Sequence, residues 1–142
     1  MPTRKRMTVE QRMTRDVQTL SEDQSLRDAI AVMQRHRIRH LPVVTGERIV
    51  GLVTDRDVKR ATPSLLSGVD QQQFDHVLSA TRVAQVMTRS PFTVTPSTTL
   101  KDAAKVVIDR KFGALPVVEK DKLVGIITAT DLLRAFYEML EE

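Results

Sequence analysis

The segment Gly51–Asp57 combines residue types that can bind a phosphorylated ligand. An apolar strand is expected to end at Thr54, and a helix is expected to begin at once. The free backbone N–H groups at such a helix start favour an anion. The Thr54 hydroxyl can donate to a phosphate, Arg56 adds a planar cation, and the Asp57 carboxylate can accept hydrogens from a ribose diol. Together these groups suit a nucleoside phosphate.

Plain helix capping explains the same residues without any ligand. Thr54 or Asp55 would cap the helix, and Asp57 would pair with Arg60 one turn later. The segment by itself leaves both interpretations open.

The pattern returns in Gly125–Asp131, where Thr128 and Asp131 keep the hydroxyl and the diol acceptor. Thr130 stands where Arg56 stands in the first segment, so one cation is lost. If both segments bind a ligand, the second should favour a ligand with less phosphate charge, or bind it more weakly.

A basic run, Arg35–His40, lies just before the next apolar strand. Arg35 and His36 close a helix, where cations interact favourably with the helix dipole. Arg39 and His40 lie beyond that end, and the second half of the chain has no basic residue at either corresponding position. The first site is therefore expected to be the more basic one.

The chain is an internal repeat. Shifting it by 74 residues places residues 9–61 on residues 83–135 without a gap, and 20 of these 53 positions are identical. Such a repeat identifies two copies of one supersecondary unit. The expected organisation is a basic tail at residues 1–8, a first repeat at 9–61, a linker with a helix at 62–82, and a second repeat with a C-terminal helix at 83–142.

Each repeat predicts the same elements: a short opening strand, a helix, two strands joined by a tight turn, and a second helix. Ser25 and Thr99 precede the first helices as expected caps. The paired strands are expected at 41–44 and 49–53, then at 115–118 and 123–127. The closing helices are expected at 55–61 and 129–140, and the linker helix at 69–80.

Composition excludes several classes of protein. The 142 residues contain no cysteine and no tryptophan, and the net charge is +4. These features argue against disulfide frameworks, thiolate metal sites and base-stacking surfaces. There is no nucleotide-binding glycine-rich loop, no nucleophile beside a base and no span of membrane length, so no enzyme, metal site or membrane segment is expected. The expected compartment is the cytoplasm.

The tandem pattern Met-Thr, Leu-Pro-Val-Val and Gly-h-h-Thr-x-x-Asp (h, apolar) resembles the cystathionine β-synthase (CBS) domain pair, or Bateman module, over residues 9–137. The resemblance implies an α/β (α+β) fold in which two βαββα repeats pack sheet to sheet about a pseudo-twofold axis. It implies that Asp57 and Asp131 hold ribose hydroxyls, that Thr54 and Thr128 touch phosphate or ribose, and that Arg39 and Arg56 neutralise phosphate. The full set of implied ligand residues is Val17, Thr19, Arg39, His40, Pro42, Thr54, Asp55, Arg56, Asp57, Thr93, Val94, Pro116, Thr128, Thr130 and Asp131.

The resemblance also implies a stand-alone regulatory module that binds AMP, ADP or ATP, with S-adenosylmethionine and NADH ranked after them. A homodimer and an unidentified protein target are the implied partners, with Val58, Leu132, Leu133 and Phe136 as candidate dimer contacts; ordinary core packing explains these four equally well. The first rival is a structural scaffold that binds no ligand. The second is an accessory protein that binds nucleic acid through its basic residues, which a strong salt dependence would reveal.

Overall fold

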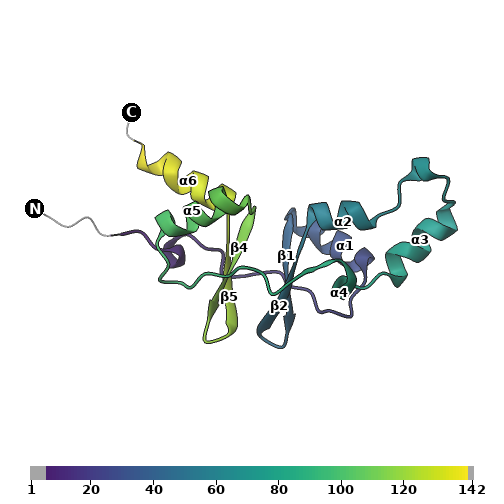
Figure 1. The fold of residues 1–142 in the computed structure, drawn as a ribbon, viewed down its shortest axis with the longest axis horizontal. Coiled ribbons are helices and arrows are strands. Elements are labelled where there is room, and N and C mark those ends of the chain that lie inside the picture. Colours follow the sequence, from purple (N-terminus) through teal and green to yellow (C-terminus); the bar gives the residue numbers. More distant parts are fainter. Residues whose placement is uncertain (1–5, 141–142) are drawn as a thin grey trace, which may run out of the picture. The chain divides into compact units, whose positions relative to one another are not determined.

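The computed structural model describes residues 6–140, and the chain divides into two compact units. The central unit is the continuous stretch Gln18–Pro91. The terminal unit combines the N-terminal residues as far as Val17 with the chain from Phe92 onward. Each unit contains helices and an antiparallel hairpin, so the predicted mixed helix-and-sheet fold with two repeats is confirmed (Figure 1).

The central unit contains one hairpin and several helices (Figure 1). A short third strand pairs with the hairpin. Its elements are α1 (Leu26–His36), β1 (His40–Thr45), β2 (Arg48–Thr54), α2 (Asp55–Ala61), the 3-10 turn η2 (Leu65–Ser67), α3 (Gln71–Ala80), α4 (Val83–Val86) and β3 (Thr88–Arg89). Helix α1 begins at a reciprocal cap, in which the Ser25 hydroxyl accepts the Asp28 N–H and the Asp28 carboxylate accepts the Ser25 N–H. It ends at His36, and Arg37 then adopts a left-handed conformation with φ 53°. Two histidines four residues apart on one helix could bind a metal ion together. Because α1 ends at His36 and His40 lies in β1, these two histidines do not share a helical face.

The terminal unit repeats this plan. Its elements are the 3-10 turn η1 (Val9–Gln11), α5 (Leu100–Arg110), β4 (Ala114–Glu119), β5 (Lys122–Thr128) and α6 (Ala129–Met139). The Thr99 hydroxyl caps α5 by accepting the Asp102 N–H at 3.1 Å, and Lys111 ends it with φ 57°. Helix α6 has 11 residues, whereas α2 has 7, so the terminal unit has an additional helical turn.

The opening strand predicted for each repeat is reduced to a single bridged residue. The Leu20 N–H donates to the Pro42 carbonyl at 3.0 Å, and the Leu20 carbonyl accepts the Val44 N–H at 2.8 Å. Val94 makes the same pair of bonds to β4 at 3.0 and 2.8 Å. Both bridges are parallel to the first strand of the hairpin.

The first residues of each repeat pack against the hairpin of the other repeat. In the terminal unit, Thr14 exchanges two backbone hydrogen bonds with Ile126 of β5, at 2.8 and 3.0 Å. In the central unit, β3 pairs with β2, with Thr88 opposite Leu52. Each compact unit therefore contains the hairpin of one repeat and the first residues of the other repeat. Because of this exchange of segments, the units do not coincide with the repeats as read along the sequence.

Each unit has its own apolar core. Val53 of β2 and Leu41 of β1 are fully buried in the central unit, as are Ile127 and Leu115 in the terminal unit. The strands that end at the candidate ligand residues are thus held by buried side chains. Within residues 6–140, no helix is both long and apolar enough to span a bilayer.

Candidate functional site

Thr54 ends β2 and caps α2 by a reciprocal pair of hydrogen bonds. Its hydroxyl accepts the Asp57 N–H at 3.2 Å, and one Asp57 carboxylate oxygen, Oδ2, accepts the Thr54 N–H at 2.8 Å. The Thr54 hydroxyl can also donate to that oxygen, at 3.1 Å. Helix capping is therefore confirmed for these two residues. The predicted ion pair between Asp57 and Arg60 is wrong: no ion pair joins these two described residues, because the carboxylate turns back to the cap.

The terminal unit forms the same turn. The Thr128 hydroxyl accepts the Asp131 N–H at 3.1 Å, and Asp131 Oδ2 accepts the Thr128 N–H at 2.8 Å. Both aspartates are half-buried. In residues 6–140, nothing hydrogen-bonds to the second oxygen, Oδ1, of Asp57 or of Asp131. Each cap therefore leaves one carboxylate oxygen able to accept a ligand hydroxyl.

The hairpin brings the basic residues of the central unit to this turn. The Asp55 N–H donates to the Arg39 carbonyl at 2.9 Å, and His40 lies opposite Thr54 in the strand register. Arg39 and Arg56 are exposed, whereas His40 is half-buried. Two exposed cations and one imidazole thus lie around the start of α2.

The terminal unit has the same backbone arrangement without these side chains. The Ala129 N–H donates to the Gly113 carbonyl at 2.9 Å, and Ala114 lies opposite Thr128. Thr130, in the position of Arg56, is exposed. The difference in charge between the two turns therefore arises from side chains on a common backbone frame.

Burial lowers the pKa of His40 below its ordinary value. The Asp55 carboxylate partly opposes this shift, and the neighbouring Arg39 cation reinforces it. The neutral imidazole is therefore the form that the folded protein favours.

We expect the free energy of unfolding to decrease as the pH falls below about 6.5, because the unfolded chain then binds a proton that folded His40 resists. The slope for one proton is at most about 1.4 kcal/mol per pH unit, and it vanishes once the pH is below the lowered pKa. Urea unfolding between pH 5 and 7.5 measures it. His40→Gln should lose this component, whereas His36→Gln, at an exposed position, should keep it. Equal slopes in wild type and His40→Gln would contradict the assignment.

The remaining candidates differ in accessibility. Thr19 is exposed and Thr93 is half-buried, and each directly precedes the residue that bridges to its hairpin. Pro42 and Pro116 are fully buried, and their carbonyls accept hydrogen bonds from the bridged residues. Val17 belongs to the terminal unit, unlike the other first-repeat candidates, which lie in the central unit.

The terminal unit contains an aromatic group that sequence reasoning found only in part. The resemblance to the CBS pair implies that the residues around Phe92–Val94 line a base, but the two contacts of Phe92 were not predicted. The Phe92 and Phe112 ring centroids are 6.3 Å apart, and the Arg110 guanidinium carbon lies 5.1 Å from the Phe92 centroid. Phe92 is 40% exposed, so this group offers a stacking surface. A difference between the repeats could have indicated this group, because the first repeat has Ile38 and His36 where the second repeat has Phe112 and Arg110.

The sequence model of the CBS domain matches residues 9–64 and matches again at residues 83–138. The chain belongs to the CBS-domain family. The CBS domain-containing protein YhcV of Bacillus subtilis is 31% identical over 125 residues, which are 88% of this chain and 82% of YhcV. Inosine-5'-monophosphate dehydrogenase of Korarchaeum cryptofilum is 37% identical over 119 residues, which are 83% of this chain and 22% of that enzyme. The CBS-domain chain thus matches about a fifth of the length of the enzyme.

Solved structures have the same fold. The CBS-pair protein CBSX2 of Arabidopsis thaliana superposes with a TM-score of 0.81 at 31% identity, covering 95% of this chain and 97% of the solved CBSX2 chain. A structure of CBSX2 in complex with AMP superposes with a TM-score of 0.77, covering 94% of this chain and 98% of that one. The predicted family and fold of this CBS pair are therefore confirmed.

Proposed function

We propose that this CBS pair is a regulatory module that binds adenine nucleotides and acts by binding, without catalysis. The observation that carries the proposal is the duplicated cap, in which Asp57 and Asp131 each keep one carboxylate oxygen without a partner among the described residues. The AMP complex of CBSX2, whose solved chain is 31% identical and is matched over 98% of its length, supports the same ligand class.

Each residue in the turn has a proposed role. The free oxygen of Asp57 accepts a ribose hydroxyl, the Thr54 hydroxyl contacts ribose or phosphate, and Arg39 and Arg56 neutralise the phosphates. Thr128 and Asp131 act likewise in the terminal unit. Thr19 and Thr93, with the segments around them, line the base. Arginines favour a phosphate over a cationic sulfonium, so AMP, ADP and ATP rank before S-adenosylmethionine.

The two turns are proposed to differ in the phosphate charge that they accept. Arg39, His40 and Arg56 give the central unit its basic groups, and Thr130 replaces Arg56 in the terminal unit. The central turn is thus suited to a polyphosphate, and the terminal turn to a ligand of lower charge. A chain with two such sites responds to the ratio of two nucleotides, which is the physical basis of energy sensing.

Arg56→Thr gives the central turn the residue of the terminal turn and tests this difference. We expect the affinity of the central site for ATP to fall about tenfold and its affinity for adenosine to stay unchanged, because the lost charge-assisted bond contacts phosphate alone. Isothermal titration calorimetry measures both. Arg60→Thr, an exposed change on the same helix, is the matched control. Equal losses for ATP and adenosine would place Arg56 away from the phosphate.

Nucleotide binding is proposed to reach a protein target by population shift: the ligand binds one conformation better, and the target senses that conformation. A homodimer is proposed as the assembly. Of the four candidate contacts, Val58 and Leu132 are partly buried against their unit cores, while Leu133 and Phe136 are 66% and 58% exposed. The exposed pair is therefore retained for the dimer.

A further inference from the structure

Six exposed cations lie around the end of α1 and along α2 in the central unit. The Asp55 N–H donates to the Arg39 carbonyl, which places the start of α2 beside the chain that leaves α1. Along α2, Lys59 and Arg60 follow Arg56 by three and four residues, so these three cations share one exposed face of the helix. We call the six side chains the basic surface: Arg35, Arg37, Arg39, Arg56, Lys59 and Arg60.

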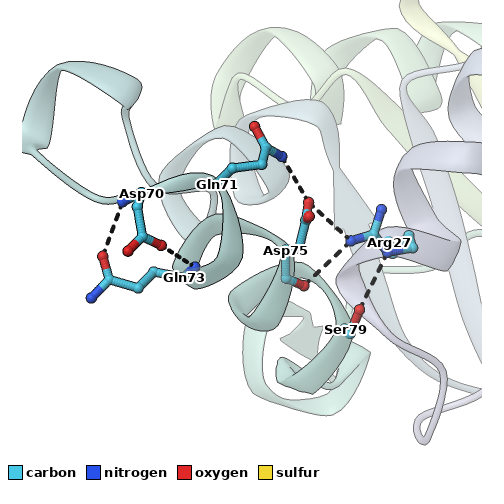
Figure 2. A network of polar contacts seen from close by, with 6 residues as sticks. All are labelled: Arg27, Asp70, Gln71, Gln73, Asp75 and Ser79. Carbon is cyan, nitrogen blue, oxygen red and sulfur yellow. Dashed lines mark hydrogen bonds and ion pairs between the residues drawn. The ribbon is translucent and has the colours of Figure 1, made fainter.

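A cation at the start of α1 is paired with the linker helix α3, whereas the basic surface is unpaired. Arg27 Nη2 lies 3.6 Å from Asp75 Oδ1, and Arg27 Nε donates to the Ser79 hydroxyl at 3.3 Å (Figure 2). Because Arg35 follows Arg27 by eight residues, about 12 Å along the helix axis, the Asp75 carboxylate serves the start of α1 and not its end. Within the described part of the chain, no side chain of the basic surface forms an ion pair or a hydrogen bond.

The fold does not require the charge of the basic surface. The carboxylates on the same segments are Asp55 and Asp57, both half-buried, and Asp57 is already bonded in the cap of α2. The 74-residue shift gives the corresponding residues of the terminal unit: Asp109, Lys111, Gly113, Thr130, Leu133 and Arg134. Together with Ala129 and Asp131, in place of the two aspartates, these residues carry no net charge. The same backbone is therefore neutral in one repeat and strongly basic in the other.

The composition of the basic surface favours a chain of phosphates over other acidic partners. Five of its six cations are arginines, whose planar guanidinium can bind phosphate through two parallel hydrogen bonds. Among the described side chains of the central unit, Leu66 is the one large apolar residue that is exposed, and it lies in η2, outside the basic surface. The surface therefore lacks the apolar anchors of protein interfaces and of membrane insertion. It also lacks the aromatic side chains on which single-stranded bases stack, so duplex nucleic acid is the polyanion that it fits.

We propose that the basic surface binds the phosphate backbone of double-stranded nucleic acid without sequence preference. Arg39 and Arg56 also belong to the proposed nucleotide turn, whereas the other four cations lie outside it. The test changes only those four and uses the chain without nucleotide, so its outcome is separate from that of nucleotide binding. The basic surface contains neither Leu133 nor Phe136, the pair retained for the dimer.

The probe is a fluorescently labelled DNA duplex of about 20 base pairs and mixed sequence, titrated with the full chain while the fluorescence anisotropy is measured. We expect micromolar binding at about 50 mM salt, and the same affinity for a duplex of unrelated sequence. Contacts to about five phosphates should give a slope of about 4–5 for log Kd against log salt concentration. Binding should therefore weaken more than about 100-fold between about 50 and about 200 mM salt.

Two double variants remove cations of the basic surface that lie outside the nucleotide turn. Arg35→Gln with Arg37→Asn changes the end of α1, and asparagine suits the left-handed backbone at residue 37. Lys59→Gln with Arg60→Gln changes the end of α2. Each double variant should weaken duplex binding about tenfold or more and lower the salt slope by about 2. Because all four side chains are exposed and unpaired, the Tm of each variant should stay that of wild type.

The matched control is Lys101→Gln with Lys120→Asn, which removes two exposed cations from the terminal unit, again one in a helix and one at a left-handed position. This control should bind the duplex as wild type does. Equal losses in the control and in both double variants would overturn the proposal, as would no binding at about 50 mM salt. Tighter binding of a single strand of the same sequence, binding of phosphatidylserine vesicles instead of the duplex, or full competition by polyglutamate of equal charge would also overturn it.

Discussion

Asp57→Asn is expected to lower the affinity of the central site for AMP about 100-fold. A hydrogen bond to a charged group contributes about 1.5–3 kcal/mol, and about 1.4 kcal/mol is a tenfold change in affinity. Asparagine keeps an oxygen for the Thr54 N–H, so the cap at the start of α2 persists while the charged acceptor of the ribose hydroxyl is lost. Isothermal titration calorimetry should show one class of sites weakened and the other, at Asp131, retained.

The matched control is Asp28→Asn. Asp28 makes the same reciprocal cap at the start of α1, with its Oδ2 3.0 Å from the Ser25 nitrogen, and it is exposed. AMP binding by Asp28→Asn should equal that of wild type. Equal affinities of Asp57→Asn and Asp28→Asn would show that Asp57 serves only as a cap. Absence of AMP binding by wild type would favour the scaffold that binds no ligand.

Gly125→Ala is expected to destabilise the terminal unit by about 2–3 kcal/mol, which lowers Tm by about 5–10 °C. A Cβ atom at this position would lie 2.6 Å from Met13 Sδ and 2.9 Å from the Thr14 carbonyl oxygen. The sulfur can move, but that carbonyl accepts the Ile126 N–H at 3.0 Å, so relief requires breaking the bridge between the opening segment and β5. Differential scanning calorimetry measures the effect.

Two comparisons separate crowding from other effects of losing a glycine. A Cβ atom added at Gly46 would meet nothing within 4 Å. Gly46 has φ +62°, in the left-handed region that asparagine also adopts. Gly46→Asn should therefore change Tm little. Met13→Ala combined with Gly125→Ala should recover only part of the loss, because the Thr14 carbonyl remains. Full recovery would mean that the side chain of Met13 is the whole obstacle.

The elements were predictable because their signals are local. The caps Ser25 and Thr54 and the spacing of apolar residues are contained within a few positions of the chain. The linker helix was predicted from Val69 but begins at Gln71, because Asp70 accepts the Gln73 N–H and acts as its cap. The length of the opening strands was overestimated. A single bridge at Leu20 already provides hydrogen-bond partners for its backbone N–H and carbonyl groups.

The exchange of segments could not be predicted from the repeat. The sequence is similar under a shift of 74 residues, so Met13-Thr14 and Met87-Thr88 are nearly equivalent partners for either hairpin. In the structure, Met87 packs on Gly51 and Met13 packs on Gly125, and because these contacts are equivalent they leave no signal of the pairing in the sequence.

For the site, Thr54 and Asp57 were found because capping and ligand binding select the same residues at the same spacing. The Asp57–Arg60 ion pair was predicted wrongly, because the cap already uses the carboxylate. Phe112 and Arg110 were missed because their contact with Phe92 joins residues about 20 positions apart. Such contacts leave no periodic pattern in a single sequence.

The exchanged segments also impose an order on synthesis. The central unit is one continuous stretch and can assemble as soon as Pro91 has left the ribosome. The terminal unit joins residues made before the central unit to residues made after it, so its closure spans the whole central unit. Contacts so distant along the chain carry a loop-closure cost and form slowly. A nascent chain therefore holds Thr14 without its strand partner until β5 has been made, and the turn at Thr128 is completed after the one at Thr54.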